Sequence, residues 1–273
     1  MALSKEVSTM KYLFALACFL FVFCICTTSW SLDPNDKALV GVWLCDDGNG
    51  DTLTDSSGNG NDGVINGTFK WDEGKIDGCL IATGGGSINV ATSDSVNSIG
   101  EALTVAGWFR VDVDSDTGIR RTNAFLLEDQ SSSEPVPDSW SFRIWTTNGL
   151  CPGAYGTTKV VKGEWTHIAG TYGDETLKLY FNGVEEKELK TDVNAAFNGE
   201  WAGKITTPAD TLQLKYSAES YTGGMDEIIM FSRALSENEI NQLMKGWKSA
   251  QALEAKDKLP ITWGNIKSVS IER

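Results

Sequence analysis

Short apolar runs separated by clusters of Gly, Asn and Asp dominate the chain from Ala38 onward. Ten of these runs have the length and alternation typical of β-strands, and no helical periodicity separates them before Ser236. Because parallel strands need crossover connections that are usually helices, this order predicts an antiparallel β-sandwich, an all-β fold. The predicted strands cover 39–45, 86–90, 102–113, 123–128, 139–146, 164–172, 176–181, 184–189, 211–216 and 224–231.

Two local signals predict individual elements. Asn182 and Gly183 separate two alternating runs, and Asn-Gly readily supplies the two positive φ angles of a type I′ hairpin turn. Later, Ser236 precedes an apolar stripe at helical spacing, and Glu239 follows three residues on, which is the pattern of a capping box. We therefore expect a tight hairpin at 182–183 and one short helix over 236–245 that packs on the sandwich.

The first 31 residues differ from the rest of the chain. An apolar run follows Lys11 and ends in small residues at 27–31, the pattern of a secretory signal peptide cleaved before Leu32. The run is shorter than the roughly 20 residues of a bilayer span, so we expect membrane contact only through this segment, if it stays uncleaved. The sequence thus predicts a secreted, extracellular protein with a domain over 32–247 and a tail over 248–273.

The composition argues against one class of partner and limits the kinds of catalytic or metal site that the chain can form. The chain has 37 acidic and 23 basic residues, a net charge of −14, and such a surface repels a phosphate backbone, so nucleic acid is not expected. His167 is the single histidine. A zinc site or a Ser-His-Asp triad would have to be built around it alone. We expect His167 to be a hydrogen-bonded structural imidazole inside a strand.

Six motifs in order resemble one protein family. They open with GVWLCDDGNGDTLTDSSGNGNDGVI at 41–65 and close with GGMDEIIMFSRALSENEINQL at 223–243. Between them lie GKIDGCL, LTVAGWFRVD, EWTHIAGTY and LKLYFNGV. The chain resembles the concanavalin A-like jelly rolls of the laminin G type, common in bacterial secreted proteins. The resemblance implies a jelly-roll sandwich, whereas function depends on the site and not on the fold.

The resemblance also implies a calcium ion, because related jelly rolls often hold one between their first and last strands. Calcium prefers about six to eight oxygen ligands, and the Gly-, Asn- and Asp-rich loop at 55–63 offers such oxygens. The alternative is that this loop's polar side chains only cap tight turns through local hydrogen bonds. The candidate ligands are Asp55, Asn59 and Asp226, with Asp46 or Asp47 as weaker candidates.

Two cysteines occupy positions where the family usually has other residues. Cys45 stands in place of Phe and Cys79 in place of Ala, so both fall on expected core positions. In an oxidising compartment the resemblance implies a Cys45–Cys79 disulfide, which leaves Cys151 over. Three buried thiols are the alternative.

Enzymatic activity is not expected. The same sandwich carries glucanases, which use two carboxylates spaced E-x-D-x-E so that both lie on one face of a strand. That motif is absent from the chain. Carboxylates from separate loops leave a glycoside hydrolase or lyase of the same fold as an alternative.

One aromatic strand favours carbohydrate binding. Alternation in SWSFRIWT places Ser141, Arg143 and Trp145 on the face predicted to be exposed. Exposed aromatic rings stack on sugar C–H faces, while polar groups bond the hydroxyls. We interpret the protein as a noncatalytic module that binds an extracellular glycan; the alternative is an adhesion protein that binds a cell-surface or matrix protein. The candidate ligand-binding residues are Arg143, Trp145, Asn148, Tyr155 and Trp201.

Overall fold

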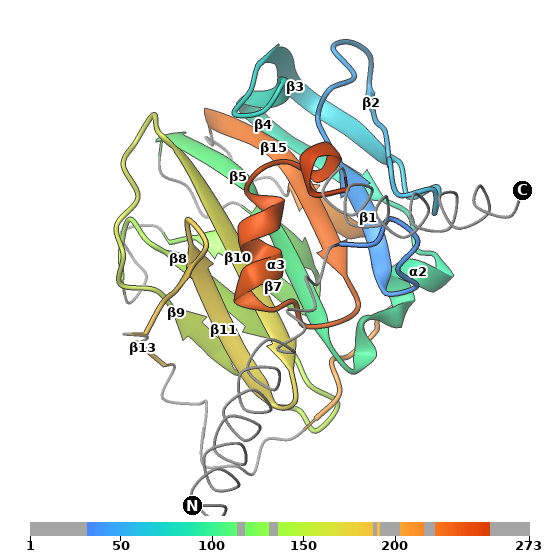
Figure 1. Ribbon diagram of the computed structural model, residues 1–273, viewed down its shortest axis with the longest axis vertical. Coiled ribbons are helices and arrows are strands. Elements are labelled where there is room, and N and C mark those ends of the chain that lie inside the picture. The colour runs from blue at the N-terminus through green and yellow to red at the C-terminus, as the bar shows by residue number, and fades with distance from the viewer. Residues whose placement is uncertain are drawn as a thin grey trace, which may run out of the picture. The chain divides into compact units, whose positions relative to one another are not determined.

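A continuous antiparallel sheet that folds over into two layers forms the domain in the computed structural model (Figure 1). The structure describes residues 32–113, 118–130, 136–187, 190–191, 203–215 and 222–251. The first layer contains β1 (Leu39–Trp43), β5 (Leu103–Val113), β10 (Trp165–Gly173), β11 (Thr176–Phe181), β12 (Val184–Glu185) and β15 (Thr222–Phe231). The second layer contains β2 (Thr52–Leu53), β6 (Gly118–Arg121), β7 (Phe125–Asp129), β8 (Trp140–Ile144), β9 (Gly153–Tyr155), β13 (Lys190–Thr191) and β14 (Leu212–Lys215).

Two long strands, β3 (Gly63–Glu73) and β4 (Gly78–Val90), belong to both layers. The first part of β4 pairs with β15 and its last part pairs with β14, so the sheet turns over along this strand. Gly67 marks the bend, with φ of 114° and an irregular register against Gly86. A Cβ on Gly67 would lie 2.5 Å from the Gly85 carbonyl oxygen, so only glycine fits there.

The main core lies between the layers. Alternate side chains of each strand point inward, and the largest buried ones include Trp43, Trp140, Phe125 and Phe142. The first and last strands meet at one edge, since β1 pairs antiparallel with β15. This arrangement is the all-β, antiparallel jelly-roll sandwich that the strand pattern predicts, and it confirms the expected fold class.

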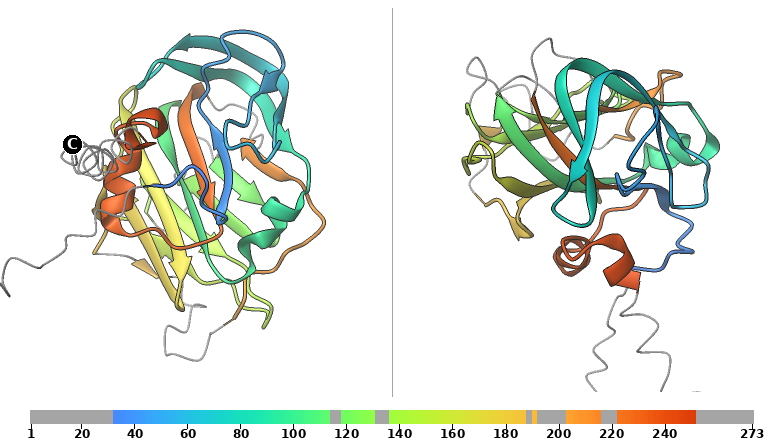
Figure 2. Two further views of the ribbon diagram at one scale, coloured as in Figure 1. Left: turned by 45° about the vertical axis from the view of Figure 1, so that its right-hand side comes forward. Right: turned by 90° about the horizontal axis from the view of Figure 1, so that it is seen from above.

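The predicted C-terminal helix is α3 (Glu237–Leu243), and it covers the outer side of the first layer (Figure 2). The capping box is confirmed: the Glu239 N–H donates to Ser236 Oγ at 3.3 Å, and the Ser236 N–H donates to Glu239 Oε2 at 2.8 Å. Leu243 and Trp247 pack in a second apolar cluster on that side. Ala250 is also buried there, so packing continues past the predicted domain end at 247.

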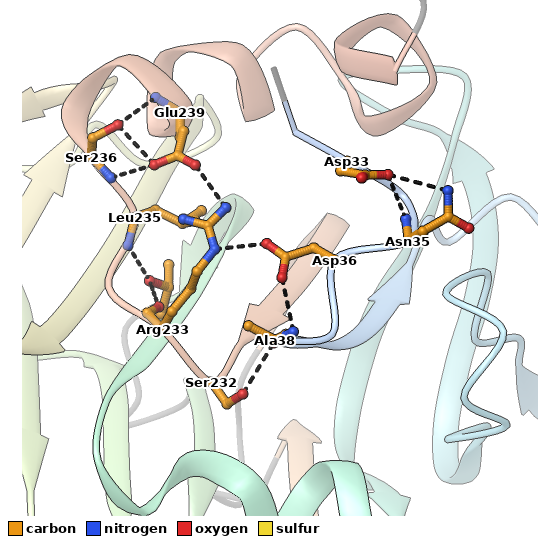
Figure 3. Close-up of polar contacts among 10 residues, drawn as sticks. Asp33, Asn35, Asp36, Ala38, Ser232, Arg233, Leu235, Ser236 and Glu239 are labelled. Atoms are coloured by element: carbon orange, nitrogen blue, oxygen red, sulfur yellow. Dashed lines mark hydrogen bonds and ion pairs between the residues drawn. The ribbon is translucent and has the colours of Figure 1, made fainter. Parts of the chain in front are cut away.

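Arg233 ties the two ends of the domain together (Figure 3). Its Nε donates to Asp36 Oδ2 at 2.7 Å, and its Nη2 lies 2.7 Å from Glu239 Oε1. Asp36 precedes β1, whereas Glu239 belongs to α3. A single guanidinium thus links the start of the described chain to its last named helix.

The predicted hairpin turn is confirmed, because Asn182 and Gly183 have φ of 46° and 77° between β11 and β12. The strand pattern missed β3 and the shorter strands β2, β6, β9 and β13. It also missed the short helix α2 (Asp94–Asn97), which is followed by a 3₁₀ turn at Ser98–Gly100. None of the helices in the described ranges is long and apolar enough to cross a membrane.

The structure does not contain the expected Cys45–Cys79 disulfide. Cys45 and Cys79 are both buried, but they are free thiols. Their sulfur atoms approach different carbonyl oxygens, that of Trp43 at 3.7 Å for Cys45 and that of Glu73 at 3.2 Å for Cys79. Burial raises the pKa of both thiols, that of Cys79 to about 11. Cys45 and Cys79 are thus buried thiols, as in the alternative, whereas Cys151 is half-buried.

Candidate ligand-binding face

Polar side chains from neighbouring strands line up on the side of the second layer that faces away from the core. Asn89 on β4 is paired with Gln213 on β14, which is paired with Arg120 on β6. Leu126 on β7 then separates Arg120 from Arg143 on β8. The chain neighbours of these residues are buried in the main core, so alternation turns the polar side chains outward. We call Asn89, Gln213, Arg120 and Arg143 the polar face.

Hydrogen bonds join the members of the polar face from three strands. Arg120 Nε donates to Gln213 Oε1 at 2.7 Å, and Gln213 Nε2 donates to Asn89 Oδ1 at 3.0 Å. Asn89 Nδ2 donates in turn to Ser87 Oγ at 2.9 Å. The four side chains are half-buried. They therefore form an ordered row of donors and acceptors that solvent still reaches in part.

Arg143 is held in place by three neighbours. Its Nη2 donates to a carboxylate oxygen of Glu128, which is buried on β7. Its guanidinium lies 6.0 Å from the ring centroid of Tyr155. A Cβ on Gly153 would lie 2.7 Å from Arg143 Cγ, so the arginine stem rests on a glycine backbone. Such fixing lowers the entropy that the side chain would lose when it binds a ligand.

The predicted ligand-binding residues differ in their exposure to solvent. Arg143 and Trp145 are half-buried and Asn148 is exposed, so all three are accessible at one end of the second layer. Tyr155 is only 3% exposed, because it lies beneath Arg143 and beside Ser141. Ser141, predicted to be exposed, is completely buried. Trp201 lies outside the described residues.

Sequence reasoning missed Asn89, Arg120 and Gln213. Asn89 lies between Ile88 and Val90, and Gln213 lies between Leu212 and Leu214, whereas Arg120 has an apolar neighbour, Ile119, on one side only. This alternation is a signal for an outward position. It does not identify a site, because the three residues come from distant parts of the chain and meet only through strand pairing.

His167 plays a structural part in the first layer. The residue is 1% exposed, its ring lies 5.3 Å from that of Trp108, and burial lowers its pKa to about 3. Its main-chain N–H donates to Asn182 Oδ1 at 3.0 Å. The ring atom Nδ1 has no hydrogen-bond partner among the described residues. A neutral, enclosed ring is unsuited to acid–base chemistry on a ligand.

Asp55 and Asn59 hold their loop against β1 through hydrogen bonds to the main chain. Asp55 Oδ1 accepts from the main-chain N–H groups of Val42 and Ser57, at 3.0 and 2.9 Å, and Oδ2 accepts from the Asn61 N–H at 2.9 Å. Asn59 donates its side-chain amide to two carbonyl oxygens of β1. Both carboxylate oxygens of Asp55 thus accept from N–H groups, and only the bond to Ser57 is the local turn cap of the alternative.

Among the predicted metal ligands, Asp226 has a carboxylate oxygen that accepts no hydrogen bond from the described residues. It is completely buried on β15, its Oδ2 accepts from the Ile76 N–H at 2.9 Å, and Oδ1 has no hydrogen-bond partner in the described chain. Burial raises the pKa of Asp226 to about 8. An orphaned buried carboxylate oxygen costs free energy unless a proton or a cation accompanies it.

Further oxygen atoms surround the loop that covers Asp226. A Cβ on Gly74 would lie 2.7 Å from Asp226 Oδ2 and 2.2 Å from the Gly78 carbonyl oxygen. Asp46 Oδ1 accepts from the Gly78 N–H at 2.9 Å. No three His, Cys, Asp or Glu side chains in the described ranges are grouped to hold a metal. A calcium ion at Asp226 would therefore need main-chain carbonyls as further ligands, and the orphaned Oδ1 is the oxygen that fits such an ion.

The fold is similar to that of several binding domains of known structure. The binding domain of Paraclostridial Mosquitocidal Protein 1 matches with a TM-score of 0.58 and 16% identity, over 76% of this chain and 52% of that one. The binding domain of botulinum neurotoxin DC in complex with SialylT matches with 0.57 and 15%, over 78% and 52%. The chain thus spans about half the length of these toxin domains. At such identities the likeness concerns the fold alone.

A third similar structure is matched over nearly its whole length. Domain 4 of AbnA, an extracellular GH43 arabinanase from Geobacillus stearothermophilus, was solved in complex with arabinotriose. It matches with a TM-score of 0.50 and 20% identity, over 76% of this chain and 98% of that domain.

No curated protein matches the chain. A family model described as the concanavalin A-like lectin/glucanases superfamily, of the laminin G type, matches residues 83–241, which is more than half of the 273 residues. The matched range includes strands of both layers and most of α3. With its two-layered antiparallel fold, the chain belongs to the concanavalin A-like lectin/glucanase superfamily.

Proposed function

We propose that this protein is a noncatalytic module that binds an extracellular glycan on the polar face. The observation that carries the proposal is the hydrogen-bonded row of Arg120, Gln213 and Asn89, in line with Arg143 on the same side of the sheet. Sugar hydroxyls both donate and accept hydrogen bonds, and amide and guanidinium groups match them well. Fixed side chains bind such groups at a low entropic cost.

Trp145 supplies the aromatic surface that sugar recognition needs. It follows Ile144 on the strand that carries Arg143, and it is half-buried, so part of the ring is open to solvent. An indole face stacks on the C–H groups of a sugar ring. The arabinotriose complex of the similar AbnA domain agrees with this role for the fold.

Glycan arrays followed by calorimetry on the best ligand test the proposal. Removing the indole in Trp145→Ala, or the guanidinium in Arg143→Ala, is expected to weaken binding by roughly tenfold or more, the loss of one well-placed contact. Lys70→Ala is the matched control, because Lys70 is exposed on the part of β3 that belongs to the first layer. Failure of the protein to bind any saccharide would refute the proposal.

A calcium ion bound by Asp226 is part of the proposed function. The orphaned Asp226 Oδ1 and the nearby main-chain carbonyl of Gly78 support this position. The ion would hold the loop at 74–78 against β15 and stabilise the domain without taking part in chemistry. Melting temperature with added calcium tests it: we expect an increase for the unmodified protein and none for Asp226→Asn. Asp55→Asn is the control, and an equal loss of the calcium effect in that variant would contradict the assignment.

We also propose that residues 1–31 direct export and are removed. The apolar run after Lys11 and the small residues before Leu32 support this function. Mass spectrometry of the protein recovered from the culture medium of a secreting host should give an N-terminus at Leu32. An intact segment on intracellular protein would contradict export.

A further inference from the structure

The polar face is the central part of a longer row that crosses the second layer. Strand pairing places one residue of each strand directly opposite the next, without a break, from β2 to β9. The residues in order are Thr52, Val64, Asn89, Gln213, Arg120, Leu126, Arg143 and Gly153. Their chain neighbours Leu53, Ile65, Ile88, Leu212, Ile119, Leu127, Phe142 and Ala154 are buried in the main core.

The row is long in comparison with one sugar. Adjacent strands lie about 4.8 Å apart, so the seven spacings from β2 to β9 span about 34 Å along the sheet. Thr52 and Val64 are exposed and the four polar-face residues are half-buried, so most of this length meets solvent. An extended saccharide chain repeats its rings at a distance close to one strand spacing. Six of the eight strands can therefore offer one accessible side chain to a sugar, whereas Leu126 on β7 and Gly153 on β9 are buried.

The charges along the row suit a neutral polysaccharide. Thr52, Asn89 and Gln213 carry no charge, and the guanidinium of Arg143 is paired with the Glu128 carboxylate. The second guanidinium of the row, that of Arg120, donates to the amide oxygen of Gln213. The chain as a whole has a net charge of −14, which repels polyanions at long range. Hydroxyl groups can use the amide and hydroxyl side chains without an opposing charge.

We propose that the ligand is an extended, neutral polysaccharide that lies across the strands of the second layer, from β4 toward β9, and that internal sugars are bound along the row. This inference rests on the proposed glycan binding and specifies its ligand class. It differs from recognition of a terminal sugar, in which one or two residues would supply all of the contacts.

Affinity for oligosaccharides of increasing length tests this inference. Affinity gel electrophoresis of the full chain with arabinan, xylan, mannan and mixed-linkage β-glucan, and with the anionic polygalacturonate and alginate, selects the polymer. Calorimetry then compares its disaccharide with its hexasaccharide. We expect binding to strengthen by about tenfold or more with length, since each further strand adds contacts. Asn89→Ala and Arg143→Ala should each weaken hexasaccharide binding, whereas at most one of them should affect the disaccharide.

The outcomes separate this inference from the proposed function. Equal affinity for disaccharide and hexasaccharide, or tighter binding of the anionic polymers, would overturn the extended neutral chain and leave glycan binding intact. Retention of none of the polymers, together with no bound saccharide on the arrays, would overturn both. Because each variant is compared on two ligands, disaccharide binding that one variant retains demonstrates that it is folded.

Discussion

The ring of Phe142 on β8 packs directly on the backbone of Gly170 on β10, where the two layers touch. A Cβ at Gly170 would lie 2.4 Å from Phe142 Cγ. We expect Gly170→Ala to lower the free energy of unfolding by about 1–3 kcal/mol, because an overpacked core must shift side chains or backbone. Urea denaturation measures the change. Gly100→Ala is the control, since its Cβ would meet no heavy atom closer than 3.9 Å, and equal losses would contradict the packing.

Loss of the helix cap should destabilise the outer cluster. Ser236→Ala removes the acceptor for the Glu239 N–H and one partner of the Glu239 carboxylate. The expected cost is about 1 kcal/mol of unfolding free energy, typical of an N-cap. Chemical denaturation gives the value, with the exposed Ser98→Ala as the control. A Ser236→Ala protein as stable as the parent would show that the capping box is dispensable.

Because two buried carboxyl groups have raised pKa values, we expect the free energy of unfolding to fall as the pH rises in calcium-free buffer. Burial raises the pKa of Asp226 to about 8 and that of Glu227 to about 7, above their ordinary values of 3.8 and 4.5. The folded state therefore holds these protons more tightly than the unfolded chain does. Their stabilising effect is complete below about pH 4 and is lost as the pH rises through 7 and 8.

The variant Asp226→Asn isolates this effect, because its amide cannot ionise. With chelator present, we expect the melting temperature of the variant to gain on that of the parent as the pH increases from about 5 to 8. Differential scanning calorimetry at several pH values checks the trend. A difference that stays constant with pH would mean that Asp226 does not titrate in this range.

Cys45 and Cys79 should resist alkylation in the native state. Both thiols are buried and their pKa values are raised, which suppresses the reactive thiolate. Treatment with iodoacetamide near neutral pH, followed by mass spectrometry of peptides, should find both unmodified until denaturant is added. The half-buried Cys151 is the internal comparison. A mass two hydrogens lower for the peptides of Cys45 and Cys79 would instead indicate a disulfide.

Local signals predicted some elements well and others not at all. The Asn182–Gly183 turn and the Ser236 cap depend on residues close in sequence, so the sequence alone predicts them. β3 was missed because Asn66 and Gly67 read as a turn, whereas in the structure Gly67 sits in a bulge that keeps the strand continuous. Pairing with β4 keeps β3 continuous through Gly67, and the sequence of one segment does not reveal its pairing partner.

The candidate site was predicted only in part for a similar reason. Arg143 and Trp145 lie on one aromatic strand, so alternation placed them together. Arg120 and Gln213 join them across strands that are far apart in sequence. Tyr155 was expected to bind the ligand, but it lies beneath Arg143. Strand alternation predicts on which side of the sheet a residue lies. It does not predict whether a long side chain from a neighbouring strand covers that residue, because this depends on the tertiary structure.

The pairing of β1 with β15 governs the order in which the polypeptide can mature. Leu39 meets Phe231, so nearly two hundred residues must be synthesised before the opening strand finds its partner. Closing so large a loop is slow compared with forming a local hairpin such as β10 and β11. The nascent chain therefore carries an unpaired, apolar strand until β15 has been synthesised, and this strand is a natural target for holding chaperones.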